Sequence, residues 1–241
     1  MRYLSRPELG DFERRRLLYG SDETHYWTND WSPDFYRLQA RAGFISIAIE
    51  HEKLGPVLVP EIQSAYAVLD WPDLHLSRSM RRWMRSERCA QADYVLQMGH
   101  DLSEILAGVA TAHGERNWLS PTYADLLARL AAQGEVDGFR VMTPALVSRS
   151  SGRVIAGEVG YSVGRVYTSL TGFFDRQDAR HDNVGTLQLV RLCGELEASG
   201  FAFWNLGHPS LQYKRDLGAK VIPRGPFLER WLSESGTGGS L

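Results

Sequence analysis

The chain has 241 residues, and 43% of them are hydrophobic, which suffices for one large domain or for a domain with a small annex. Its net charge of −2 excludes a strongly basic nucleic-acid-binding protein, so any RNA contact must come from a local basic patch. Two cysteines without metal or disulfide spacing, no apolar signal core and no apolar run of about 18 residues predict a cytoplasmic protein that neither binds a metal nor crosses a membrane.

Residues 1–65 are aromatic-rich and irregular, and we expect them to form a small N-terminal domain. Within this region Ser32 can cap a helix that Pro33 starts and Gly43 ends. Alternating apolar residues then predict a strand over 44–49 and an edge strand over 57–60.

Residues 66–232 are expected to form the main domain, which begins with helices. Residues 77–88 are predicted to form a basic helix, because Arg78, Arg81, Arg82 and Arg85 recur at the spacing of one helix face. Apolar periodicity predicts a helix over 102–109 and a further one that starts at Ser120 and stops at Gly134.

The period then changes to that of strands. We predict strands over 139–142, 145–149, 153–162 and 165–174, then a helix from Asn183 to Gly200, a strand over 201–206, a short helix over 211–217 and a strand over 219–223. Residues 233–241 are glycine-rich and are expected to be a flexible tail. This order predicts an α+β fold, in which helices flank a mixed, mostly antiparallel sheet of the acetyltransferase type.

Three segments carry a sharper resemblance, to the leucyl/phenylalanyl-tRNA–protein transferase family. They are Trp71-Pro72-Asp73-Leu74-His75-Leu76-Ser77-Arg78-Ser79, then Asn117-Trp118-Leu119-Ser120-Pro121, and Leu217-Gly218-Ala219-Lys220-Val221-Ile222-Pro223-Arg224. They resemble the family's W-P-x-x-L-H-x-S-R-S, T-W-I-T/S-P and S-L-G-A-x-x-I-P-R. The order and spacing agree over roughly residues 66–231.

The resemblance implies an enzyme that takes leucine or phenylalanine from charged tRNA and joins it to a protein N-terminus. Aminoacyl-tRNA is then the co-substrate, and no other cofactor is expected. The acceptor is a protein or peptide N-terminus, and we expect a monomer.

Two departures from the family bear on the chemistry. The family's G-E-S-M-F strand supplies a carboxylate where this chain has Ser169-Leu170-Thr171-Gly172-Phe173-Phe174, and the family's D-C-Q becomes Asn205-Leu206-Gly207-His208. Neither family carboxylate is plainly present, so the chain resembles a divergent branch.

Candidate catalytic residues follow from these positions. His208, beyond a buried strand, suits proton transfer at neutral pH, while Asn205 can orient the amine or the oxyanion. Thr171 and Ser169 can donate a hydroxyl to the oxyanion, since they stand where the family has its glutamate. Each of the four has an alternative role as an ordinary structural residue.

Binding residues are predicted on two other segments. Trp118 matches a family tryptophan that helps to hold the 3′ end of tRNA, and the arginines of 77–88 suit its phosphates. Phe173, Phe174 and Trp204 can wall an apolar pocket for the transferred side chain, although core packing explains them equally well.

Two other functions remain open. A CoA-dependent N-acyltransferase is disfavoured because residues 178–185 lack the paired small residues of a pyrophosphate-binding loop. A catalytically inactive module that binds N-termini or RNA would fit the loss of both carboxylates.

Overall fold

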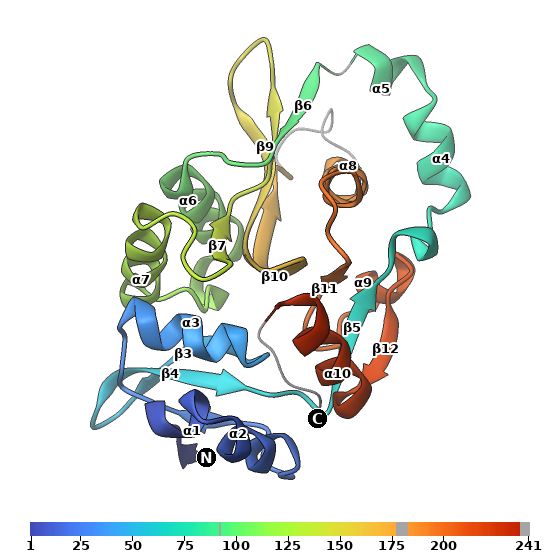
Figure 1. Cartoon of the computed structure of the whole chain (residues 1–241). Coiled ribbons are helices and arrows are strands. Elements are labelled where there is room, and N and C mark those ends of the chain that lie inside the picture. Colours follow the sequence, from blue (N-terminus) through green and yellow to red (C-terminus); the bar gives the residue numbers. More distant parts are fainter. Residues whose placement is uncertain (92, 177–182, 237–241) are drawn as a thin grey trace.

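The computed structural model describes residues 1–91, 93–176 and 183–236. Its centre is a sheet with strand order β12-β5-β11-β10-β9-β8-β6, in which β7 also pairs with β9 (Figure 1). Strands β10 and β11 run parallel, and the other pairings between named strands of this sheet are antiparallel. The sheet strands are β5 (Ala65–Leu69), β6 (Tyr94–Gln97), β7 (Phe139–Met142), β8 (Ala145–Ser148), β9 (Val154–Val163), β10 (Val166–Phe174), β11 (Phe203–Asn205) and β12 (Lys220–Pro223).

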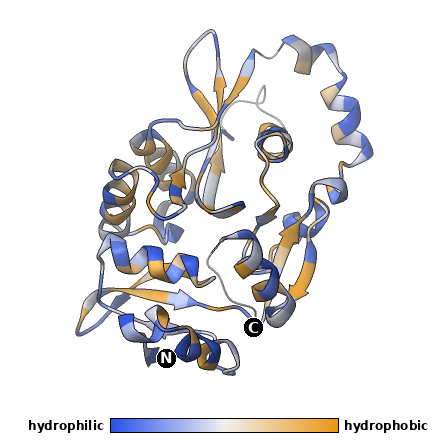
Figure 2. Ribbon diagram, in the orientation of Figure 1, coloured by the Kyte–Doolittle hydropathy of each residue, from blue (hydrophilic) through white to orange (hydrophobic). Residues whose placement is uncertain are grey.

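The predicted α+β class and the mostly antiparallel sheet are confirmed. Consecutive antiparallel strands are followed by helix α8 (Val184–Ala198), which leads into β11 beside β10. This is the order predicted for an acetyltransferase-type domain. Strand β5 is coloured largely hydrophobic in Figure 2, as expected for a strand with neighbours on both sides.

Helices cover both faces of the sheet. On one face α6 (Leu102–His113) and α7 (Pro121–Ala132) bury Ile105 and Leu126 in a core that also holds Tyr161 of β9. On the other face α8 packs against Tyr167 and Trp204, and α4 (Arg78–Met84) adds Met80 to an adjoining apolar cluster. The remaining helices are α5 (Glu87–Gln91), α9 (Gln212–Asp216) and α10 (Arg224–Glu234).

Residues before β5 form short elements that lie below the sheet in Figure 1. They are β1 (Arg2–Tyr3), α1 (Arg6–Gly10), α2 (Phe12–Tyr19), β2 (Tyr26–Trp27), α3 (Pro33–Arg41), β3 (Ile45–His51) and β4 (Gly55–Glu61). Ser32 caps α3 as predicted, and the two predicted strands are present as β3 and β4, which pair in antiparallel fashion. One buried core runs from Leu4 through Tyr66 to Trp231, and a domain boundary at residue 65 stays a prediction.

Two predictions of secondary structure are wrong. The predicted basic helix over 77–88 breaks after Met84, and α5 begins at Glu87. The Ser86 hydroxyl between them donates to the Trp83 carbonyl and accepts from the amide of Cys89 in the first turn of α5. The flexible tail does not begin at 233. Ser233 and Glu234 belong to α10, and Ser235 is buried, whereas 237–241 lie outside the described residues.

Strands β5 and β6 and helix α10 are absent from the sequence-based prediction. The five apolar residues of β5 carry no period that separates a strand from a helix. Within the described ranges, no helix has both the length and the apolar character that spanning a membrane requires.

Candidate active site

Strand β10 has an edge that opens part-way along its length. It pairs with β9 from Val166 to Phe174, but with β11 only from Val166 to Thr168. Beyond Thr168 the two parallel strands part, and residues 169–173 of β10 are half-buried. The candidate site lies at this opening, since it exposes strand residues in the middle of the sheet.

A bulge in β10 decides which side chains share a face. Ser169 lies opposite Gly160 of β9, and Thr171 lies opposite the neighbouring residue Val159, so Leu170 is the extra residue. Side chains alternate along β9, and Ser169 and Thr171 therefore point to opposite faces of the sheet. The two hydroxyls, either of which was predicted as a donor to the oxyanion, therefore serve different faces of the sheet.

Glu158 of β9 is the centre of a hydrogen-bonded cluster on the Ser169 face. Its Oε1 accepts a 2.6 Å bond from the Tyr167 hydroxyl and a 2.7 Å bond from the Ser169 hydroxyl. The indole Nε1 of Trp204 donates to the Ser169 oxygen at 2.8 Å. Ser169 and Trp204, predicted for different roles, therefore meet at a carboxylate that is not among the predicted site residues.

Two glycines make room for this cluster. A Cβ on Gly160 would lie 2.6 Å from the Tyr167 hydroxyl, so only glycine lets this tyrosine lie across β9 and reach Glu158. A Cβ on Gly172, which stands opposite Glu158, would lie 2.8 Å from the Glu158 Cβ. The signal of this site in the sequence is a charged residue between two glycines of a buried strand, Gly157-Glu158-Val159-Gly160.

Burial governs the electrostatics of the cluster. Glu158 is 5% exposed, and burial raises the pKa of its carboxyl to about 7, against the hydrogen bonds from Tyr167 and Ser169 that lower it. Burial and the nearby Glu158 hold the pKa of Tyr167 well above its ordinary value, so this hydroxyl stays a donor at neutral pH.

Asn205 and His208 lie around the end of β11. Asn205 is buried, its Nδ2 donates to the Thr168 hydroxyl at 3.3 Å, and its Oδ1 accepts from the Gly207 amide at 2.9 Å. His208 is exposed, and its Nδ1 accepts from the Ser210 amide at 3.2 Å. A neutral ring in this bond carries its proton on Nε2, which makes that nitrogen a donor.

The three residues predicted to wall a pocket lie apart. Trp204 is fully buried on the Glu158 face. Phe173 is on the opposite face and presses against Gly108 of α6, where a Cβ would approach its ring to 2.2 Å. Phe174 is 38% exposed, and the guanidinium of Arg176 lies 4.7 Å from its ring centre. The structure does not gather them around one cavity.

The residues predicted to bind tRNA occupy two distant places. Trp118 is half-buried beside α7, and its ring meets that of Tyr123 edge-on at 5.2 Å. Arg78, Arg81, Arg82 and Arg85 are all exposed on and just after α4, which lies at the upper right of Figure 1. No ion pair joins these four arginines to a carboxylate in the described part of the chain.

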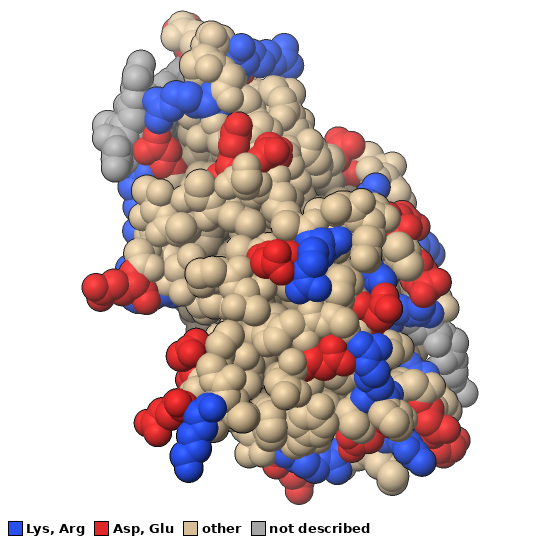
Figure 3. Space-filling model, turned by 90° about the vertical axis from the view of Figure 1, so that its left-hand side faces the viewer, with Lys and Arg blue, Asp and Glu red and all other residues tan. Residues whose placement is uncertain are grey.

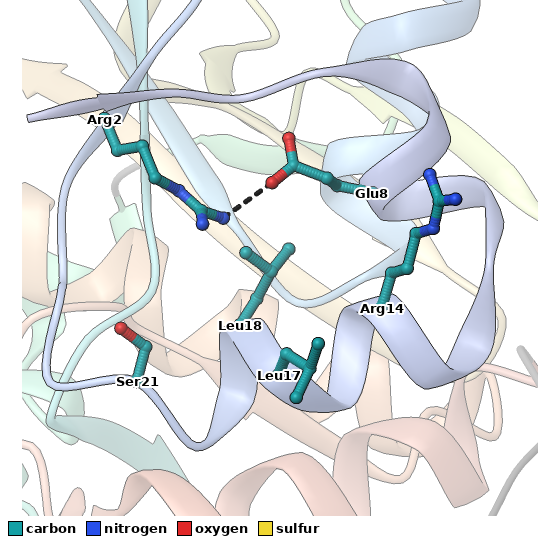
Figure 4. Close-up of a pocket in the computed structure, with 6 residues that line it drawn as sticks. All are labelled: Arg2, Glu8, Arg14, Leu17, Leu18 and Ser21. Atoms are coloured by element: carbon teal, nitrogen blue, oxygen red, sulfur yellow. Dashed lines mark hydrogen bonds and ion pairs between the residues drawn. The ribbon is translucent and has the colours of Figure 1, made fainter.

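Charge is mixed on another side of the molecule. Figure 3 shows the side of the molecule that is on the left in Figure 1, and there acidic and basic side chains alternate without a block of one sign. A separate pocket of about 240 Å³ lies between α1 and α2, where Arg2 and Glu8 form a 2.6 Å ion pair above Leu17 and Leu18 (Figure 4). Its six lining residues include none of the Glu158 cluster.

Comparisons with known proteins point to one family. The family model for leucyl/phenylalanyl-tRNA protein transferase matches residues 68–231, a range that contains the Glu158 cluster, α4 and Trp118. A leucyl/phenylalanyl-tRNA–protein transferase of Yersinia pestis (strain Pestoides F) is 26% identical over 164 residues, 68% of this chain. The matched segment spans 62% of that relative's length.

Solved structures show weaker likeness. L-PGS from Bacillus licheniformis aligns with a TM-score of 0.47 and 12% identity, over 79% of this chain and 63% of that one. The C-terminal domain of a putative lysylphosphatidylglycerol synthetase from Agrobacterium fabrum aligns with a TM-score of 0.45 and 14% identity, over 86% and 70%. Likeness at this level carries no weight for function.

Proposed function

Since this chain belongs to the leucyl/phenylalanyl-tRNA–protein transferase family, we propose that it transfers an amino acid from aminoacyl-tRNA to a free amine. The names of the relatives point to leucine or phenylalanine as the transferred residue and to a protein as the acceptor. We propose the free N-terminus of a protein or peptide as the attacking amine. The observation that carries this proposal is the family match over 68–231, which encloses both the opening of β10 and the basic face of α4.

The proposed transfer requires few chemical groups from the protein. The ester of aminoacyl-tRNA is already activated, so the amine attacks it directly and no covalent intermediate with the enzyme forms. What is required is placement of the two reactants, donors for the oxyanion and a group that accepts the proton of the amine. Aminoacyl-tRNA is the co-substrate, and the proposal includes no further cofactor.

The arginines of α4 fit the nucleic-acid part of this substrate. Four exposed guanidinium groups on about two helical turns give a local positive stripe on a chain of net charge −2. Phosphate contacts of this kind make affinity fall steeply with salt. We propose this stripe as the tRNA contact, with Trp118 as a stacking residue for the 3′ end.

A transfer assay tests the proposal. The chain is incubated with radiolabelled leucyl- or phenylalanyl-tRNA and a peptide that begins with Arg or Lys, and label is expected on the peptide. The same peptide with an acetylated N-terminus is the control, because it lacks the attacking amine. Absence of transfer from every aminoacyl-tRNA of a complete set would refute the proposal.

Two further arms separate the alternatives. Acetylation of the peptide by acetyl-CoA would favour a CoA-dependent acyltransferase. Binding of tRNA or peptide without any transfer would favour an inactive module. The double variant Arg81→Glu/Arg82→Glu is expected to weaken tRNA binding and to flatten its salt dependence, and an unchanged salt slope would exclude the stripe as the contact.

A further inference from the structure

A buried carboxylate on β9 lies outside the family's catalytic pattern. The resemblance places the carboxylate on the strand that here reads Ser169 to Phe174, whereas Glu158 belongs to the neighbouring strand. Among the ion pairs of the described residues, none includes Glu158. Burying an unpaired carboxyl costs free energy, and a group kept in such a place beside an opening is a candidate for chemistry.

The hydrogen bonds leave one oxygen of this carboxyl available. Tyr167 and Ser169 both donate to Oε1, and Trp204 fixes Ser169 from behind. No hydrogen bond between described residues involves Oε2. The cluster therefore orients the carboxyl by one oxygen and leaves the other for a partner that is not part of the chain.

The opening of β10 lies beside this carboxyl. Gly172 stands opposite Glu158 and has no side chain to cover it, and β11 has already left β10 at this level. Gln188 of α8 is 3% exposed, and its Nε2 has no hydrogen-bond partner among the described residues. On α8 it lies between Val184, which packs near Ala156, and Leu192, which packs with Tyr167 and Trp204. An unused amide donor thus sits over the same face as the unused carboxyl oxygen.

We propose that Glu158 is a catalytic residue of this chain, the group that accepts the proton of the attacking amine, and that Tyr167, Ser169 and Trp204 are its positioning residues. This inference rests on the proposed function. The neutral amine nitrogen forms a bond to the carbonyl carbon of the aminoacyl ester, and its N–H proton passes to the ionised carboxyl. The C–O bond to the ribose then breaks, and the proton passes from the carboxyl to the leaving ribose oxygen.

The groups around Glu158 suit this exchange. Its pKa of about 7 means that both the ionised and the protonated form are populated at neutral pH, as a base that later acts as an acid requires. Tyr167 on β10 and Tyr213 on α9 are titratable groups near it, and partial burial together with the charge of Glu158 raises the pKa of Tyr213 to about 12. On the α6 side His113 bonds the carbonyl of Gly172 through Nε2 at 2.9 Å. The neighbour on α8 is the neutral Gln188.

The first measurement needs no tRNA. In ¹⁵N-labelled protein, the indole N–H resonance of Trp204 is assigned by its loss in Trp204→Phe and followed from pH 5 to pH 9. Because this indole donates to Ser169, which donates to Glu158, we expect the resonance to shift with a midpoint near pH 7. The shift should vanish in Glu158→Gln and persist in the control Glu195→Gln, whose side chain is exposed on α8.

The second measurement is the single-turnover transfer rate. In wild type we expect the rate to rise as the pH increases through 7. In Glu158→Gln the amide oxygen can still accept from Tyr167 and Ser169. We expect this variant to transfer about 100-fold more slowly, or slower still, at pH 8, with its KM for the peptide within about threefold of that of wild type. A wild-type rate that is flat between pH 6 and 8, or an undiminished rate in Glu158→Gln, would overturn the role of Glu158 alone. Absence of transfer by wild type itself would overturn the proposed function as well, and the Trp204 titration would then still report on the carboxyl.

Discussion

The buried carboxyl of Glu158 makes a sharp prediction about stability and pH. Its pKa is raised from 4.5 in an exposed carboxyl to about 7 in the folded chain, so the folded state binds the proton more tightly than the unfolded state. The contribution of Glu158 to the free energy of unfolding is therefore greatest below pH 4.5, decreases as the pH rises from 4.5 to about 7, and is constant above that. Since each tenfold change in proton affinity is worth about 1.4 kcal/mol, the ionised carboxyl costs the folded state about 3 kcal/mol at pH 8.

Glu158→Gln removes this cost, because the amide is neutral and keeps an acceptor for Tyr167 and Ser169. We expect the variant to match wild type at pH 4.5 and to unfold about 6–12 °C higher at pH 8, since about 1 kcal/mol moves Tm by about 2–4 °C in a chain of this size. Thermal unfolding by circular dichroism at both pH values measures this, with Glu195→Gln as the control. A Tm difference that is the same at pH 4.5 and pH 8 would refute the pKa argument.

Two other predictions concern the framework of the site. Gly160→Ala places a Cβ 2.4 Å from the Thr168 carbonyl oxygen and is expected to destabilise the chain by about 1–3 kcal/mol. The control Gly194→Ala on α8, whose Cβ would meet nothing within 4 Å, should stabilise the chain slightly. Equal shifts of Tm in the two variants would contradict the packing described around Gly160. The guanidinium of Arg224 donates to the carbonyls of Tyr19, Ser21, Ile62 and Gln63, which a single ammonium group cannot span. Arg224→Lys should therefore lower the free energy of unfolding by about 1–3 kcal/mol and speed proteolysis of the segment before residue 63. Unchanged protease resistance would show that these bonds do not hold that segment in place.

The segments that carry the family resemblance prove to hold one another. Asp73 pairs with Lys220 at 2.6 Å, and the amide of His75 donates to the Leu217 carbonyl. Gly218 has a φ of 104°, and a Cβ there would lie 1.9 Å from the Asp73 carbonyl oxygen, so glycine is required. The first motif, residues 71–79, and the third, residues 217–224, thus contact each other and hold β12 against the segment that follows β5.

The secondary structure could be predicted where a local signal exists. The strands from Phe139 to Phe174 follow from alternation and from turns at Gly152 and Gly164, and α3 follows from its Ser-Pro start. Helix α10 does carry a local signal, because its buried residues Phe227, Leu228, Trp231 and Leu232 recur at helical spacing, and the prediction missed it. What the sequence does not show is the partner of this face, since Phe227 stacks on Tyr66 of the distant strand β5.

The cluster at the site was out of reach for a more specific reason. Ser169 and Trp204 were singled out by their positions, but Glu158 stands on another strand and reaches them only through register. The bulge at Leu170 then places Thr171 and Ser169 on opposite faces of the sheet, whereas residues two apart in a regular strand share a face. A prediction that assumes regular alternation of side chains along a strand cannot locate a single inserted residue, and this residue determines which side chains share a face.

A site defined by a face of the sheet can receive its carboxylate from either of two adjacent strands, and this leads to a final prediction. The Ser169 oxygen and the Glu158 carboxyl oxygen are 2.7 Å apart, so Glu158→Ser combined with Ser169→Glu moves the carboxyl from β9 to β10 within the same cluster. Tyr167 and the indole of Trp204 remain as donors to it. Each single variant loses or doubles the carboxyl, and we expect the double variant to transfer at least 10-fold faster than Glu158→Ser, a coupling of about 1.4 kcal/mol or more in a double-mutant cycle. Additive losses in the single-turnover rate would show instead that the strand, and not the face, determines where the carboxyl must stand.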